Sequence, residues 1–134
     1  MRFQRAESPA LLSGHEAVRR FFSSCFLSDE SARERLWVAH VDHAARCLHV
    51  EYYDGEPESV GMPVREIILD AARYGSAGVV LAHNHPSGDS RPSKADCQAT
   101  RKLARAAEAL DLAILDHLVF AGGDCSSMRR MGLL

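Results

Sequence analysis

The sequence lacks any hydrophobic run long enough to span a bilayer, and its N-terminus, Met-Arg-Phe-Gln-Arg-Ala-Glu, lacks the apolar core of a signal peptide. We therefore expect neither membrane insertion nor secretion, and a cytoplasmic location as the default. The chain also lacks an excess of positive charge, because 16 Lys and Arg residues face 18 Asp and Glu residues. Proteins that follow a nucleic-acid backbone are usually strongly basic, so this balance argues against nucleic-acid binding.

Cysteine is sparse, and no Cys-x-x-Cys pair occurs among the four cysteines. This pattern predicts neither a disulfide framework nor a thiolate zinc site. Hydrophobic residues make up 46% and charged residues 25% of the 134 positions, which is typical of one globular domain with its own core. We expect a single domain over residues 1–134, with its core at about 14–123 and extensions at 1–12 and 124–134.

The hydrophobic periodicity predicts helices and strands in alternation. Helices are expected over 14–26, from Pro63 to about Gly75, and over 93–110, the first with a capping box at Ser13-Gly-His-Glu16. Strands are expected over 36–41, 47–53, 59–62, 77–82 and 113–120, the first two as a hairpin and the last followed by a Gly122-Gly123 turn. The order predicts an α/β (α+β) protein with helices packed on a mostly antiparallel mixed sheet.

Two histidines and a carboxylate follow the apolar run 77–82. His83 and His85 are two apart on a predicted strand, so their side chains point the same way, whereas Asn84 is expected to point elsewhere. A turn that contains Pro and Gly then leads to Asp96, eleven positions after His85. This separation is long enough for the chain to reverse and place the Asp96 carboxylate next to the two imidazoles. Two neutral nitrogens and one carboxylate oxygen form a ligand set typical of catalytic zinc, with one coordination position open.

The same residues also have non-metal explanations. A His-x-His pair alone is often only hydrogen-bonded at the end of a strand. Ser93-Lys-Ala-Asp96 is also typical of a capping box at the start of a helix. The capping and metal-binding roles are compatible, because a helix start holds a carboxylate rigidly.

His83-Asn-His85-Pro86, six further residues and Ser93-Lys-Ala-Asp96 together resemble the JAMM motif of MPN-domain metalloproteases. The sequence His-Asn-His-Pro-Ser-Gly-Asp resembles the bacterial RadC-type branch of that family. Segments on both sides of this motif also resemble that branch, so that the resemblance covers most of residues 28–123. The resemblance implies a single MPN-like domain with a three-layer, cytidine-deaminase-like arrangement. It also implies a zinc-dependent hydrolase that cleaves a peptide or isopeptide bond in a protein substrate.

The resemblance further implies roles for individual residues. His83, His85 and Asp96 are expected to hold Zn²⁺, and a glutamate before an upstream strand is expected to act as the general base. Matching Glu34 and the apolar strand after it to the RadC-type pattern places this base at Glu34; Glu66 and Glu51 are alternatives that sequence separation does not decide. Ser93 is expected to help hold the oxyanion of the tetrahedral intermediate, besides capping its helix.

Two further groups of residues each have a functional and a structural interpretation. Asp116-His117 could contact a zinc-ligating imidazole, although a structural pair within the last strand is the interpretation we favour. Lys94, Arg101 and Arg105, with Arg91 nearby, could form a basic stripe, but a solvated helix face is favoured.

RadC-type proteins usually carry an N-terminal region resembling a helix-hairpin-helix module, which we expect this chain not to contain. The alternatives to a hydrolase are a non-enzymatic zinc-binding or scaffold module and a DNA-repair-associated metalloprotein. The sequence is compatible with a homo-oligomer.

Overall fold

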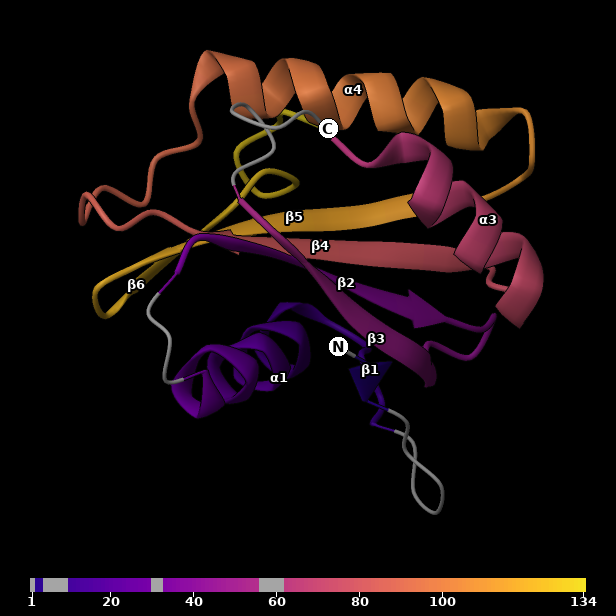
Figure 1. Cartoon of the computed structure of the whole chain (residues 1–134), viewed down its shortest axis with the longest axis horizontal. Helices are drawn as coiled ribbons and strands as arrows, with labels where there is room; N and C mark the ends of the chain where they lie inside the picture. Colours follow the sequence, from indigo (N-terminus) through magenta and orange to yellow (C-terminus); the bar gives the residue numbers. More distant parts are fainter. Residues whose placement is uncertain (1, 4–9, 30–32, 56–61) are drawn as a thin grey trace.

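The computed structural model describes residues 2–3, 10–29, 33–55 and 62–134 of the chain. Its helices and strands are shown in Figure 1 and follow one another as β1 (Arg2–Phe3), α1 (His15–Ser28), β2 (Arg35–Val41), β3 (Cys47–Asp54), α3 (Val64–Tyr74), β4 (Gly78–Asn84), α4 (Lys94–Glu108), β5 (Ala113–Ala121) and β6 (Asp124–Ser127). None of the helices in this part of the chain is long and apolar enough to cross a membrane.

The strands form one mixed sheet in the order β1-β3-β2-β4-β5-β6. Strands β4 and β5 are parallel, and the other neighbouring pairs are antiparallel. Strands β2 and β4 lie at the centre of the sheet and are buried along almost their whole length. Burial on both faces explains the nearly continuous apolar runs from which these strands were predicted. The mostly antiparallel sheet and the α+β class predicted from the sequence are confirmed.

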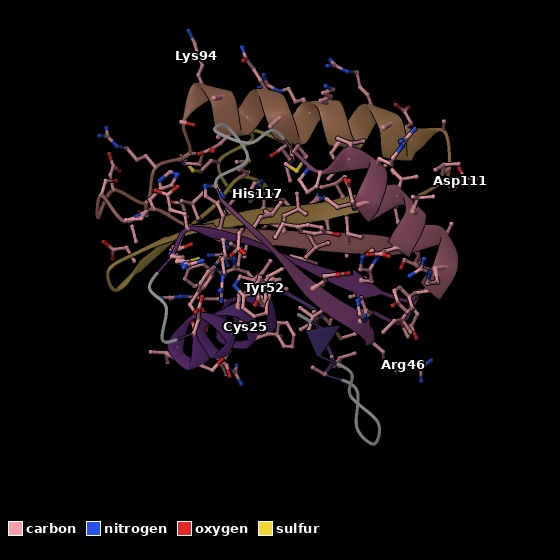
Figure 2. All side chains as sticks on the ribbon, in the orientation of Figure 1. Cys25, Arg46, Tyr52, Lys94, Asp111 and His117 are labelled. Atoms are coloured by element: carbon pink, nitrogen blue, oxygen red, sulfur yellow. The ribbon has the colours of Figure 1, made fainter. Side chains whose placement is uncertain are left out.

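Helices cover both faces of the sheet, which places the core in two layers (Figure 1). Helix α1 covers one face, where Phe22 of the helix and Trp37 of β2 belong to the same cluster of buried side chains. Helices α3 and α4 cover the other face, where Ile67 and Leu103 pack with Leu81 of β4. Figure 2 shows side chains filling the space between these layers. Residues of β4 therefore alternate between the two cores.

Buried side chains also occur just before α1 and after β6. Leu12 is buried before α1, and Met128 is fully buried after β6. Met128 packs with Cys97 and Val119, while β6 pairs with β5 after the expected glycine turn. The C-terminal segment thus covers part of the face on which α4 lies.

The structure differs from one local prediction and does not describe most of the residues of another. The capping box at Ser13–Glu16 is wrong, because Gly14 occupies the N-cap of α1 with φ 88° and no side chain caps the helix. The strand expected over 59–62 falls largely on residues 59–61, which lie outside the described residues, and Met62 is not in a strand.

His40 of β2 is fully buried between the sheet and α3. Burial and neighbouring His49 lower its pKa from 6.5 to about 4, while Asp70 acts in the opposite direction. Tyr74 of α3 also faces the ring, and the Ser76 hydroxyl lies 2.9 Å from His40 Nδ1. His40 is therefore neutral in the folded chain at pH 7.

Because His40 is buried in its neutral form, the stability of the folded chain should depend on pH. Between pH 6.5 and about 4, His40 is protonated in the unfolded chain but not in the folded chain. The free energy of unfolding should therefore decrease as the pH is lowered through this range, by up to about 3 kcal/mol. Denaturant titrations with chelator present, from pH 7.5 to 4.5, measure this dependence. His40→Gln should reduce the slope, whereas His43→Gln at an exposed position should leave it unchanged. Equal slopes in all three proteins would contradict the assignment.

Candidate metal centre

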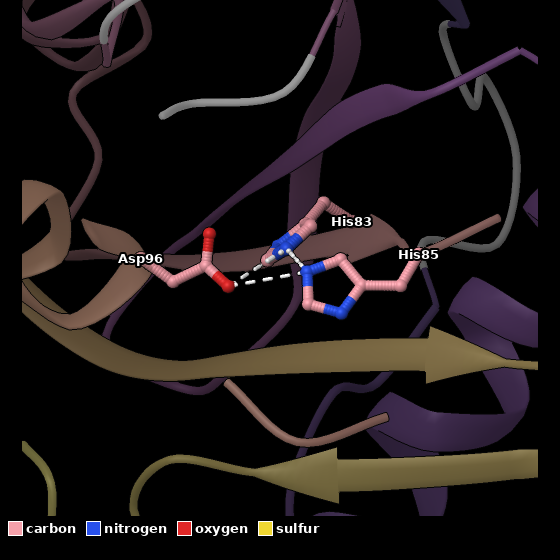
Figure 3. A group of neighbouring side chains, drawn as sticks. All are labelled: His83, His85 and Asp96. Atoms are coloured by element: carbon pink, nitrogen blue, oxygen red, sulfur yellow. Dashed lines mark hydrogen bonds and ion pairs between the residues drawn. The ribbon is translucent and has the colours of Figure 1, made fainter. Parts of the chain in front are cut away.

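His83 stands at the carboxyl end of β4, where it pairs with Leu36 of β2 on one side and Val119 of β5 on the other. Its side chain is fully buried on the face covered by α4. His85 follows two residues later, and 11% of its side chain is exposed. Both rings point to the same place, so the predicted common orientation is confirmed (Figure 3).

The start of α4 brings Asp96 to these histidines. Ser93 is the N-cap, and its hydroxyl oxygen accepts a hydrogen bond from the Asp96 amide at 3.0 Å. The Ser93 amide in turn donates to Oδ2 of Asp96 at 2.9 Å. This reciprocal pair is the capping box predicted from the sequence, and it holds the carboxylate in one orientation.

Three donor atoms converge at this point (Figure 3). The Nε2 atoms of His83 and His85 lie 2.9 Å apart, and Oδ2 of Asp96 lies 3.4 Å from the first and 3.2 Å from the second. Zinc bonds of about 2.0–2.2 Å at tetrahedral angles separate neighbouring ligand atoms by about 3.3 Å. The His/His/Asp group therefore has nearly the dimensions of a metal site and could hold an ion without backbone movement.

The hydrogen-bond partner of His85 determines which of its nitrogens faces the group. Nδ1 of His85 lies 2.8 Å from the carbonyl oxygen of Asp89. A carbonyl oxygen only accepts, so Nδ1 carries the hydrogen. In the neutral ring Nε2 then presents a lone pair to the neighbouring donor atoms.

A longer chain of hydrogen bonds orients His83. The Thr100 hydroxyl donates to the carbonyl oxygen of Asp96 at 2.8 Å, so its oxygen accepts from Nδ1 of His117 at 2.7 Å. Complete burial lowers the pKa of His117 well below its ordinary value, which keeps that ring neutral. Nε2 of His117 therefore accepts from Nδ1 of His83 at 2.7 Å, and Nε2 of His83 is directed at the group.

Of the two alternatives for Asp116-His117, His117 makes the contact with an imidazole, which the sequence alone did not favour. Figure 2 labels it between α4 and the sheet, and its contact with His83 depends on the parallel pairing of β4 and β5. Asp116 does have the structural role: its carboxylate accepts from the Ser127 hydroxyl and from the amides of His117 and Arg129. In the sequence, the signal for this contact is a histidine on the predicted strand that follows the helix beginning at Ser93-Lys-Ala-Asp96.

Asp96 is ionised although it is fully buried. Burial acts to raise its pKa, but its hydrogen-bond and charge interactions with His83, together with the Ser93 amide, hold that pKa below its usual range. Oδ1 of Asp96 is buried without a hydrogen-bond partner in the described part of the chain. A metal ion bound here would supply positive charge to this buried carboxylate. The residues present fit the expected zinc.

The expected base, Glu34, stands at the same end of the sheet. Strand β2 runs antiparallel to β4 with Leu36 opposite His83, so continuing the register places Glu34 opposite His85 and on the same face. The side chain of Glu34 is half-buried.

Asn84 lies outside the His/His/Asp group, as expected, and instead holds the backbone around Glu34. Its Oδ1 accepts from the Arg35 amide at 2.9 Å, and its Nδ2 donates to the Arg33 carbonyl oxygen at 3.0 Å. The two residues that flank Glu34 are thereby tied to the end of β4. This clamp between distant segments could not be read from sequence spacing.

Two hollows of about 400 Å³ each open beside His85. One is bordered by Ser93 and the turn before it, and the other lies against Phe26 of α1 and Phe120 of β5. His85 lines both, whereas His83 and Asp96 are sealed from solvent. The group is therefore reached past His85.

The remaining sequence candidates lie elsewhere. Glu66 is exposed in the first turn of α3, and Glu51 on β3 contacts His49 instead. The α4 cations Lys94, Arg101 and Arg105 are exposed. Arg91 pairs with Asp89 at 2.8 Å and, by this hydrogen bond, lowers the pKa of that carboxylate to about 2.

We expect Thr100→Val, which keeps the side-chain shape but removes the hydroxyl, to weaken zinc binding roughly ten- to hundred-fold. The valine leaves His117 without the acceptor that sets its tautomer, so His117 no longer reliably accepts from His83. Competition with a chromophoric chelator measures the zinc Kd. Thr100→Ser should bind zinc like the unmodified chain, and equal affinity for the valine variant would rule out this role for the hydrogen-bond chain.

Comparison with known proteins agrees with the geometry. The model of the RadC-like JAB domain matches residues 12–133. Over 131 residues the chain is 32% identical to the UPF0758 proteins of Aliivibrio fischeri (strain MJ11) and Aliivibrio salmonicida (strain LFI1238), with 97% of this chain and 58% of each relative covered. It thus spans somewhat over half the length of these relatives. The resemblance inferred from the motif is confirmed, and the chain belongs to the RadC-like JAB domain family.

Proposed function

We propose that this chain is a zinc-dependent hydrolase that cleaves an amide bond in a peptide or an isopeptide-linked protein. The observation that carries the proposal is the convergence of two imidazole nitrogens and an ionised carboxylate on one point that is reached past His85. Structural zinc sites are usually closed by four protein ligands, whereas three ligands and an approach from solvent are typical of catalytic ones.

Each of the expected site residues would have a separate role in amide hydrolysis. Zinc held by His83, His85 and Asp96 would lower the pKa of water toward neutrality and polarise an amide carbonyl. The carboxylate of Glu34 would take a proton from the attacking water and deliver it to the departing amide nitrogen. Ser93 would donate its hydroxyl hydrogen to the oxygen that gains negative charge. The water oxygen ends on the carbonyl carbon as the C–N bond breaks.

The anchoring of its backbone supports Glu34 as the base. Its carbonyl oxygen accepts from the Gly55 amide at 2.9 Å, and Asn84 holds both of its neighbours. Arg35, the next residue, forms ion pairs with Asp29 at 2.9 Å and Asp54 at 3.0 Å. A base must be held at a fixed distance from the reacting water, and these contacts supply that constraint.

Zinc content tests the ligand assignment. We expect the purified chain to hold zinc at the His/His/Asp group, and His85→Ala to abolish binding there because one of three protein donors is lost. Binding is measured by zinc titration of chelator-treated protein, with bound metal assayed by mass spectrometry. His43→Ala removes an exposed imidazole and serves as the matched control. An unchanged affinity in the His85 variant would exclude this group as the site.

The role of Glu34 is tested separately from metal binding. Glu34→Gln should keep its zinc yet slow hydrolysis roughly 10²- to 10⁴-fold, because the amide cannot accept the proton. New peptide termini produced from a peptide and isopeptide library are counted by mass spectrometry.

Glu66→Gln is the control and should cleave at the normal rate. Normal turnover by the Glu34 variant would disprove its role as base. Absence of any cleavage by zinc-loaded, unmodified protein across the library would favour a non-enzymatic module instead.

A further inference from the structure

A second group of metal-ligating side chains lies on the face of the sheet that α3 covers. His49 and Glu51 are two apart on β3, and Asp70 is on α3. One ligand atom from each lies within 4.8 Å of the others. His49 pairs with His40 of β2, four residues from the Leu36 that pairs with His83. At a strand rise of about 3.3 Å this separates the two groups by roughly 13 Å, too far to share an ion.

The second group is buried and rich in negative charge. His49 is 3% exposed and Asp70 is 7% exposed, while Glu51 keeps 16% of its side chain accessible. Nε2 of His49 lies 3.3 Å from Oε2 of Glu51, a separation that also suits two ligands of one ion. A His49–Glu51 ion pair alone explains two of the three residues. The second carboxylate, Asp70, is ion-paired with the largely exposed Arg73 and still lies within ligand distance of the first two residues.

Unpaired buried nitrogens provide an independent indication. Nδ1 of His49 and Nε2 of His40 are buried and have no hydrogen-bond partner in the described part of the chain. The two rings are cross-strand neighbours with centres 6.0 Å apart. Buried polar atoms without partners are rare, and an ion with its coordinated water would give such nitrogens a partner.

The surrounding side chains hold the donors in place. The ring of Tyr74 stacks on that of His49, with centres 4.2 Å apart and planes 21° apart. The Tyr53 hydroxyl lies 3.5 Å from Oδ2 of Asp70, and Arg73, whose side chain is 59% exposed, lies 3.7 Å from Oδ1. The imidazole is thus oriented before any ligand arrives, as in sites built to bind an ion.

We propose that His49, Glu51 and Asp70 form a second site for a divalent metal ion, distinct from the His/His/Asp group. One imidazole nitrogen and two carboxylate oxygens suit Zn²⁺ or Mn²⁺. The ion links β3 to α3 and so fastens the helix to the sheet. It neutralises the paired carboxylates, which makes its role structural and independent of the hydrolysis proposed above.

Zinc stoichiometry distinguishes the two sites. The 134-residue chain, freed of any affinity tag and stripped with chelator, is titrated with ZnCl₂ and assayed by mass spectrometry. The unmodified chain should bind two equivalents and His85→Ala one. The doubly substituted His85→Ala/Asp70→Asn and His85→Ala/Glu51→Gln chains should bind none. Glu108→Gln, at an exposed position on α4, is the control and should keep both equivalents.

Thermal unfolding provides a second readout. Zinc should raise the melting temperature of the His85→Ala chain and leave that of a folded double variant unchanged, with circular dichroism verifying the fold. A His85→Ala chain that binds no zinc would overturn the second site while leaving the first intact. Retention of one equivalent by both double variants would overturn it as well. If the unmodified and His85→Ala chains each bound one equivalent and both double variants bound none, the second site would be supported and the His/His/Asp site refuted.

Discussion

The hydrogen-bond chain from His83 through His117 and Thr100 to the backbone of Asp96 is the constraint on which the site depends. It begins at one expected metal ligand and ends on the carbonyl of another. Because the last acceptor is a carbonyl oxygen, every hydrogen in the chain has a fixed direction. Nε2 of His83 is consequently left facing Nε2 of His85 and the Asp96 carboxylate. These three atoms converge on one point, where a metal ion could be held.

The sheet makes this arrangement geometrically possible. Parallel pairing of β4 and β5 sets His117 beside His83, and α4, which connects those strands, starts at Asp96. Antiparallel pairing of β2 with β4 brings Glu34 to the same edge, where the Asn84 amide holds the backbone on either side of it. Residues 50 positions apart therefore meet because of strand order. The same sheet face carries the His49 group farther along β3, so one layer holds two clusters of potential ligands.

The sequence predicted those parts that depend on local pattern. The buried central strands, the α4 capping box and the common orientation of His83 and His85 all follow from alternation or from cap chemistry within a few residues. The roles of Thr100 and Asn84 were missed, and the contact of His117 with His83 was only the less favoured of two alternatives. Each of these roles depends on which strands are neighbours, and no local pattern encodes that. The Ser13 capping box failed because Gly14, with its positive φ, occupies the cap position itself. Glu34 and Ser93 remain predictions in their catalytic roles, now with a backbone position that suits each.

The protonation pattern of the three histidines tests the central claim most directly. Nitrogen-15 NMR of the imidazole rings in zinc-loaded protein at pH 7 distinguishes protonated, ligated and free nitrogens. His83 and His85 should carry hydrogen on Nδ1 and zinc on Nε2, and His117 should be neutral with its hydrogen on Nδ1. A hydrogen on Nε2 of His83 in the zinc-loaded protein, or a doubly protonated His117, would contradict it.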